Sequence, residues 1–201
     1  MANVIKLRKG LDVNLKGKAA KEEFQVKKPA VYALMPDDFT GMKPKVVVKE
    51  NDVVKVGDSL FVDKNHPEIK FVSPVSGRVT MVERGDRRKV LSVRVEADAE
   101  QQYVDFGKKN VGQMTAQEVK DLLLESGLFG FFRQRPYDVT ANPSDTPKAI
   151  FVSAFNSMPL AADFEYVLRG READFQAGLD ALAKMAKTYL GVSSKQTATA
   201  L

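Results

Sequence analysis

The sequence predicts a mixed fold of α and β structure, in which a β-rich first half is followed by a helix and an incomplete parallel α/β unit. Three observations lead to this class. Short valine-rich runs separated by turn residues occupy the first hundred residues. A helix-start pattern stands near residue 115, where the apolar period changes from that of strands to that of a helix. A continuous apolar run at 149–155 precedes an amphipathic helix and a second apolar run.

The first domain is predicted over residues 1–105 as a small β barrel or sandwich. Its strand candidates are rich in Val, Ile and Phe, which suit a pleated, half-buried surface, and Gly, Pro, Asn and Asp separate them. Strands this short and closely spaced favour a barrel or sandwich over parallel βαβ units. The candidates lie at 45–49, 53–56, 59–62, 70–73, 78–82 and 90–95.

A helix and a proline-rich connection are predicted over 106–148. Thr115 and Glu118 have the spacing of a capping box, in which each side chain accepts a hydrogen bond from the other residue's backbone N–H. Gly127 is placed to end this helix in a left-handed conformation. Three prolines between 133 and 148, with Asn, Ser, Asp and Thr around them, predict a turn-rich loop after the helix.

An incomplete, Rossmann-like parallel α/β domain is predicted over 149–201. The run 149–155 is expected to be a strand covered on both faces. A short helix at 163–168, a longer one at 171–187 and a strand at 188–192 should follow and make one right-handed crossover. Residues 193–201 complete no element. We therefore expect a longer natural protein or an engineered fragment, with a frayed C-terminal tail as the alternative.

The composition excludes several classes of function. The 201 residues include no cysteine and a single histidine, His66. This excludes disulfides, thiolate metal sites and cysteine nucleophiles, and no His-based zinc site or triad is expected, so no catalytic or metal residue is assigned. The net charge of +5 is mild and basic runs are short, so no nucleic acid partner is predicted. No apolar stretch approaches the ~20 residues of a membrane helix, and no apolar signal core opens the chain, which indicates a cytosolic location.

Two segments resemble, in order, the two halves of a biotinyl/lipoyl-type domain. Val48–Leu60 has an apolar run, a polar turn with Asp, Val-Val, Gly-Asp and Leu, and Ser73–Val79 has the Ser-Pro, Gly and Val of the barrel corner. The resemblance implies a barrel-sandwich hybrid. Its arm lysine stands on an exposed hairpin between the halves, where Lys64 falls. Because the stretch 64–73 is longer than in lipoyl domains and the Met-Lys-Met of biotin carriers is missing, we favour a solvated lysine over a carrier lysine.

A resemblance over almost the whole chain is carried by the segments 5–13, 43–44, 63–67, 83–88, 147–152, 156–161 and 172–179. Through these segments the chain resembles the A-subunit family of the sodium-translocating NADH:quinone reductases, whose chains are longer than this one. The resemblance implies a peripheral subunit on the cytoplasmic face of the bacterial inner membrane, docked on partner subunits, chiefly the membrane-embedded flavin subunit. It also implies quinone interaction, with ubiquinone or menaquinone as the acceptor of a complex that exports sodium.

The segment Glu125–Arg133 is similar in place to the FMN loop in the flavin subunit of respiratory complex I. That protein is a remote relative of this family and of the C-subunit of the electron-transport complex. In its loop a run of glycines lets backbone N–H groups approach a phosphate, whereas phenylalanines stand here. We therefore expect this chain to bind no FMN through this loop. The strand exit 155–159 lacks Gly-x-Gly-x-x-Gly, so NADH binding by this chain is not expected either.

The candidate quinone or partner slot consists of Phe129, Phe131, Phe132 and Arg133. Clustered aromatic rings can hold a quinone ring or a partner helix, but core packing between the two domains is the favoured alternative. Arg133 or Arg135 could contact an anion, although a solvated or salt-bridged role is favoured for both.

Three further features have alternative interpretations. His66 is expected as an exposed turn residue, and the adjacent Asp37 and Asp38 suit a loop or interface better than an acid/base pair. The basic hairpin 84–89 suits an acidic partner, anionic lipid or a bare turn equally. For the whole chain, the alternatives to a non-flavin reductase subunit are a carrier domain modified at Lys64 and a non-catalytic binding module of an electron-transport complex.

Overall fold

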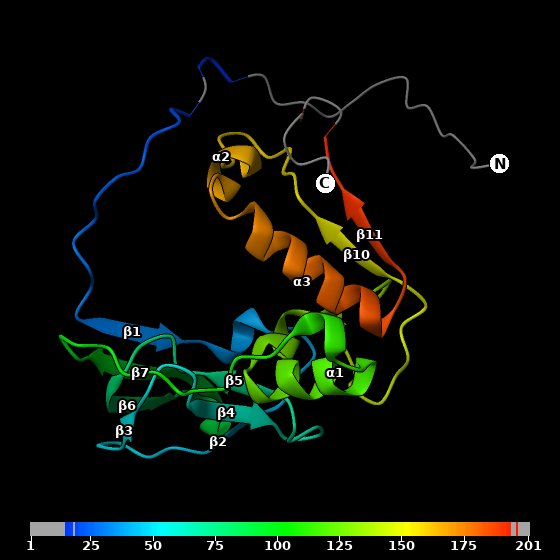
Figure 1. Cartoon of the computed structure of the whole chain (residues 1–201). Helices are drawn as coiled ribbons and strands as arrows, with labels where there is room; N and C mark the ends of the chain where they lie inside the picture. Colours follow the sequence, from blue (N-terminus) through cyan, green and yellow to red (C-terminus); the bar gives the residue numbers. More distant parts are fainter. Residues whose placement is uncertain (1–14, 18, 194–195, 197–201) are drawn as a thin grey trace.

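The structure is a computed structural model that describes residues 15–17, 19–193 and 196. The predicted family segment at 5–13 and most of 193–201 lie outside the described residues. A β domain and a small α/β unit follow one another along the chain, with α1 (Ala116–Glu125) between them (Figure 1). Among the described residues, no helix combines the length and the apolarity that a membrane crossing requires.

The β domain consists of two antiparallel sheets. The larger has the order β1-β7-β6-β3, and the smaller has the order β2-β4-β5. All six predicted strands are present. The strands are β1 (Val31–Leu34), β2 (Pro44–Val46), β3 (Val53–Val54), β4 (Ser59–Asp63), β5 (Lys70–Val72), β6 (Gly77–Arg84) and β7 (Val90–Ala97).

Strand β1 was not predicted from the sequence. Its four residues do not alternate in polarity, and they lie between two prolines, Pro29 and Pro36. The strand forms at the sheet edge because it pairs with β7, from Val31 opposite Glu96 to Leu34 opposite Val93. Pairing between residues about 60 positions apart in the chain produces no pattern in the sequence of the strand itself.

The core lies between the two sheets. Val93 and Val95 of β7 point inward, as the period of a strand requires, whereas Val79 and Val82 of β6 both pack on the core because the register shifts after Val79. One core side chain, Phe129, comes from outside the β domain. The buried cluster contains Val54, Leu60, Phe61, Ile69, Phe71, Val75, Val79, Val93, Val95 and Phe129.

The connection contains the predicted helix with its capping box. Thr115 N–H donates to Glu118 Oε2 at 2.7 Å, and Glu118 N–H donates to Thr115 Oγ1 at 3.3 Å, so α1 begins where its sequence predicts. The predicted loop after it holds a short hairpin, β8 (Arg133–Gln134) with β9 (Val139–Thr140). Two residues in each strand are too few to show a periodic pattern.

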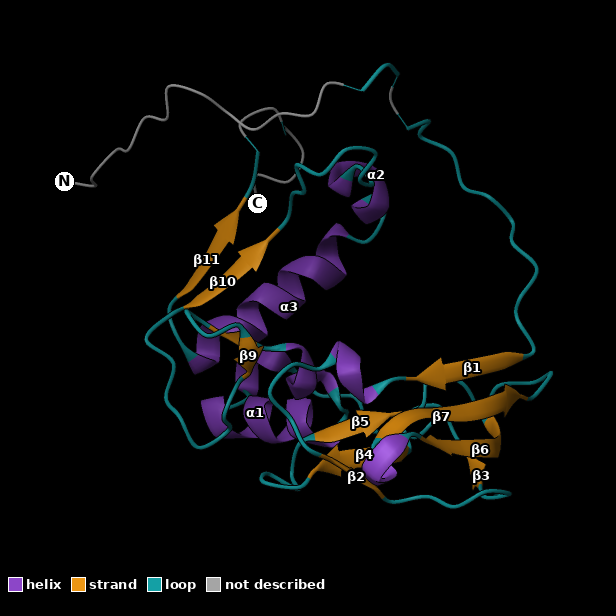
Figure 2. Ribbon diagram, turned by 180° about the vertical axis from the view of Figure 1, so that it is seen from behind, coloured by secondary structure: helices purple, strands orange, loops and turns teal. Residues whose placement is uncertain are grey.

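The α/β unit pairs β10 (Ile150–Ser153) in parallel with β11 (Thr188–Gly191) through α2 (Phe164–Leu168) and α3 (Glu172–Met185), as predicted. Helix α3 lies between this strand pair and α1 (Figure 2). The prediction that the first strand is covered on both faces is wrong for the described residues. Ile150 is buried, but Phe151 is 78% exposed and stacks on Tyr189 with ring centroids 5.2 Å apart. The predicted domain limits at 105 and 148 stay predictions.

Candidate functional site

The short turn η4 (Leu128–Phe131) contains two of the four candidate slot residues, and Phe132 follows it directly. Gly127 ends the preceding helix with φ +77°, as predicted, and a Cβ on it would lie 2.7 Å from Cγ1 of Val72. A Cβ on Gly130 would lie 2.7 Å from Cε1 of Phe71. The two glycines therefore let the backbone of η4 lie directly on β5.

Two of the three phenylalanines of the candidate slot pack against each other, and the third points toward solvent. Phe129 is 5% exposed and belongs to the barrel core, and Phe132 packs beside it with ring centroids 5.4 Å apart. Phe131 is 68% exposed. A tight turn directs successive side chains apart, so the structure does not bring the three rings together around one slot.

Phe131 instead meets an aromatic residue that no sequence motif singled out. Its ring centroid lies 5.7 Å from that of Phe39, which follows η1 (Pro36–Asp38). Phe39 lies 4.4 Å from Phe71, which stacks on Phe61 at 5.0 Å. A row of four rings thus leads from the surface into the core. In the sequence, Phe39 is a single aromatic residue among polar neighbours. This isolation is the feature that could have marked it as a packing residue.

Arg133 connects two loops through backbone carbonyl groups. Its Nη2 donates to the carbonyl of Asp38 at 3.1 Å, and its Nη1 lies 3.4 Å from the carbonyl of Asp138. Arg135 lies 3.5 Å from the Asp138 carboxylate. Both guanidinium groups thus have structural partners, and Arg133 holds the loop that carries Phe39 beside the β8–β9 hairpin.

Lys64 lies in the β4–β5 connection, which is where a carrier lysine would stand. Its side chain is exposed, while its backbone N–H donates to the carbonyl of Lys43 at 2.7 Å. The preceding Asp63 is buried and accepts from the N–H groups of Lys43 and Asn65. The buried carboxylate therefore organises this connection, and the lysine amine extends into solvent.

The remaining titratable candidates do not converge. His66 Nδ1 lies 3.6 Å from Glu68 Oε1 in the same exposed turn. Asp37 pairs with Lys89 Nζ at 2.6 Å, and Asp38 contributes its carbonyl to Arg133. The two adjacent aspartates therefore do not form an acid/base pair.

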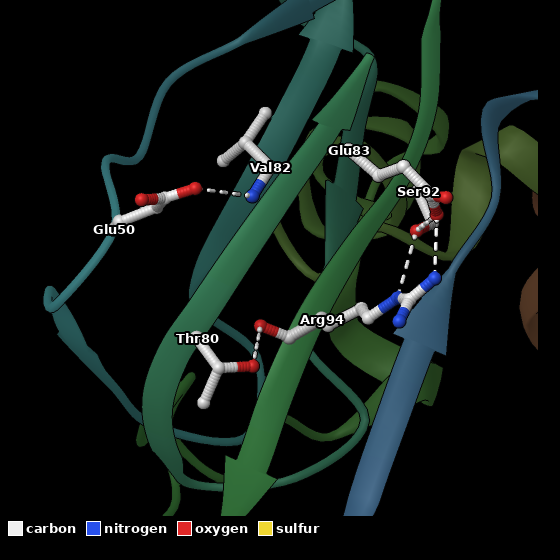
Figure 3. A network of polar contacts seen from close by, with 6 residues as sticks. All are labelled: Glu50, Thr80, Val82, Glu83, Ser92 and Arg94. Carbon is white, nitrogen blue, oxygen red and sulfur yellow. Dashed lines mark hydrogen bonds and ion pairs between the residues drawn. The ribbon is translucent and has the colours of Figure 1, made fainter. Parts of the chain in front are cut away.

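A polar network links the strands on the outer face of the larger sheet (Figure 3). Ser92 Oγ and Arg94 Nη2 both donate to Glu83 Oε2 at 2.7 Å, and Glu50 accepts from the N–H of Val82 at 3.3 Å. The Ser92 hydroxyl and then the Arg94 guanidinium lower the pKa of Glu83, because both stabilise the ionised carboxylate. This network belongs to the sheet rather than to a ligand site.

Two grooves in the described part of the chain lie away from the candidate residues. A shallow groove of about 960 Å³ separates residues 108–112 from α3, and Lys108, Lys109 and Lys184 line it with Asp180. A smaller groove of about 240 Å³ runs along α1. None of the candidate slot residues lines either groove.

The strand exit after β10 is an exposed loop. Asn156 Oδ1 accepts from the N–H of Met158 at 2.9 Å, and Met158 is 69% exposed. No group of three or more His, Cys, Asp or Glu side chains among the described residues could hold a metal ion.

Two family models match the chain in order. The model described as the NqrA N-terminal barrel-sandwich hybrid domain matches residues 5–98, and that of the NqrA second alpha/beta domain matches 114–201. These matches confirm the predicted barrel-sandwich hybrid and the α/β class of the second part.

Curated relatives that carry the name of the A-subunit of Na(+)-translocating NADH-quinone reductase match almost the whole chain. That of Pseudomonas aeruginosa (strain UCBPP-PA14) is 35% identical over 190 residues, which cover 93% of this chain and 42% of the relative. Those of Yersinia pseudotuberculosis (serotype O:1b, strain IP 31758) and Serratia proteamaculans (strain 568) are 36% and 37% identical over 186 residues, 90% of this chain and 41% of each relative. The chain thus spans about two-fifths of the length of these relatives.

Proposed function

Because the chain belongs to the NqrA family, we propose that it acts within a sodium-translocating NADH:quinone reductase, as a peripheral subunit that carries no flavin and contributes to quinone interaction and assembly. The observation that carries this proposal is the ordered match of two family domains along one chain. We place the protein on the cytoplasmic face of the bacterial inner membrane, against the membrane-embedded flavin subunit, as the resemblance implies.

The packing of η4 supports the absence of FMN from this loop. Phosphate-binding loops turn free backbone N–H groups toward the ligand. Here Gly127 N–H and Phe132 N–H donate to the carbonyls of Leu124 and Phe129, and the Gly130 backbone lies against Phe71. The glycines therefore allow η4 to pack closely against the barrel. The purified chain should show no stoichiometric flavin absorbance and release no FMN on denaturation, and tight FMN retention would refute this part of the proposal.

The exposed ring of Phe131 supports a contact with quinone or with a partner subunit. A large aromatic side chain at the surface, backed by Phe39, offers an apolar face that costs little conformational entropy to order. In the full-length protein within its complex, we expect Phe131→Ala to raise the KM for quinone or to weaken complex assembly. NADH oxidation with an artificial acceptor should stay unchanged.

Tyr137→Ala is the matched control, since Tyr137 is 75% exposed and belongs to the neighbouring hairpin. Equal effects of the two substitutions, or none from Phe131→Ala, would argue against a role for this ring.

Assembly is tested separately. The tagged full-length protein should recover the membrane-embedded flavin subunit from solubilised membranes. Recovery of soluble acyltransferases alone would support the carrier alternative, for which the exposed position of Lys64 in the β4–β5 connection is the favouring observation. An intact-mass measurement on natively expressed protein decides between them, because a lipoyl or biotinyl increment lost in Lys64→Arg would establish the carrier function.

A further inference from the structure

The tip of the β6–β7 hairpin presents positive charge at three arginines. Arg84, Arg87 and Arg88 are exposed, and none of them forms an ion pair within the described part of the chain. The turn contains one acidic residue, Asp86, which is itself exposed. Lys89 is engaged with Asp37 at 2.6 Å.

Several contacts hold this tip in one conformation. Gly85 N–H donates to the carbonyl of Lys89 at 2.8 Å, and Lys89 N–H donates back to the carbonyl of Asp86 at 3.1 Å. Arg84 Nη1 lies 3.4 Å from the carbonyl of Arg88. The Lys89–Asp37 pair joins the tip to η1, so the side chains of Arg87 and Arg88 leave a supported turn.

The backbone of the tip is strained at the two arginines that project from it. Arg87 has φ +52° and Arg88 has φ +61°, which is the left-handed region. Asn and Gly are the residues that tight hairpins normally place there. This conformation costs conformational free energy at two consecutive arginines, and the hydrogen bonds and the ion pair around the tip hold it in place. Strained residues of this kind cluster at functional positions.

We propose that this basic tip docks on anionic phospholipid headgroups. Guanidinium groups bind phosphate oxygens in bidentate geometry, and basic side chains are attracted to the negative leaflet. An acidic protein surface is the other conceivable partner. We favour headgroups because all residues of the tip, 84–89, are charged except one glycine, whereas specific protein interfaces place apolar side chains at their centre.

This proposal rests on the proposed function in one respect, because that function places the chain next to a membrane. The test uses the purified chain with vesicles alone, so a failure of vesicle binding and a failure of complex assembly are separate results.

The test compares Arg87→Asn/Arg88→Asn with a variant of equal charge. Asn tolerates the left-handed backbone, so the hairpin variant should keep the wild-type unfolding temperature or exceed it. The control is Lys27→Asn/Lys28→Asn, because both lysines are exposed in the segment before β1. Flotation is measured with phosphatidylcholine vesicles, with and without about one-third phosphatidylglycerol, at low and high salt.

We expect the wild-type chain to float with the anionic vesicles only, and to do so more weakly in high salt. Removing both arginines should lower the binding constant about 25-fold, at roughly 5-fold for each charge, while the control falls much less. Equal losses in the two variants would assign the binding to net charge and overturn the proposal. Absence of flotation would overturn it too, as would arginine-dependent capture of another reductase subunit without vesicle binding, which would assign the tip to a protein surface.

Discussion

Gly130 lets the connection pack closely against the barrel because it has no side chain. Its backbone lies so close to Phe71 that a Cβ would stand 2.7 Å from the ring. Phe71 is fully buried and stacks on Phe61, so it has no free space into which to move. Gly130, which lies in the segment that resembles an FMN loop in the sequence, is therefore a packing residue in this chain.

We expect Gly130→Ala to destabilise the fold by about 1–3 kcal/mol through overpacking against Phe71. Gly178→Ala is the control, since Gly178 lies exposed within α3 and a Cβ there would meet nothing within 4 Å. That substitution should stabilise the fold by up to about 1 kcal/mol. Urea unfolding of the two variants and the wild type measures both effects. Equal stabilities for the variants would contradict the packing described for η4.

The Glu83 network predicts a pH dependence of stability. Because the folded state lowers the pKa of Glu83 below its ordinary value of 4.5, the ionised carboxylate favours folding. This contribution is fully present above the ordinary pKa and is lost as the pH falls through the lowered pKa. We expect Glu83→Gln to reduce the unfolding temperature at neutral pH and to match the wild type in acid.

Thermal unfolding recorded between neutral and acidic pH tests this expectation. Glu96→Gln, which changes an exposed carboxylate on β7 outside the network, is the control. If the unfolding temperature of Glu83→Gln stays below that of the wild type by the same amount down to acid pH, the lowered pKa is not the source of the difference.

At the scale of elements, helix α1 depends on its capping box. Thr115 Oγ1 accepts from Glu118 N–H, and Glu118 Oε2 accepts from both the N–H and the hydroxyl of Thr115. We expect Thr115→Ala to cost about 1 kcal/mol of stability because a helix N–H loses its partner. Gln117→Ala in the same turn removes only a surface pair with Asp121 and should cost a few tenths of 1 kcal/mol. Chemical denaturation distinguishes the two, and similar losses would contradict the cap.

Elements with a local chemical pattern were predictable, and those made by distant pairing were not. The N-terminal cap of α1 at Thr115 and the left-handed Gly127 that follows its last turn depend on contacts within a few residues. Strand β1 exists only because β7 offers an edge, and the β8–β9 hairpin is too short for any period. Phe129, Phe131 and Phe132 looked like one cluster because the sequence cannot show how η4 turns between them.

At the scale of the molecule, the buried core is unevenly distributed. Most of the fully buried apolar residues lie between the two sheets of the β domain, whereas β10 and β11 leave Phe151 and Tyr189 on an open face. We expect amides of β4, β6 and β7 to exchange with deuterium much more slowly than those of β10 and β11 in this chain, because local opening of the β10–β11 pair exposes little apolar surface. Mass spectrometry of the peptide fragments measures this, and equal protection of the β domain and the β10–β11 pair would contradict it.

The sequence alone determined the chemistry that this chain excludes, the family it resembles, and the elements that local patterns specify. Cysteine and histidine content, the capping box and the ordered barrel motifs are properties of single residues or short segments, so they do not depend on the tertiary structure. Only the tertiary structure decided that Phe39 backs Phe131, that Arg133 binds backbone carbonyls and that Gly130 serves the barrel core. Each of these depends on contacts between residues far apart in the chain, whose geometry is set by packing and not by neighbouring sequence.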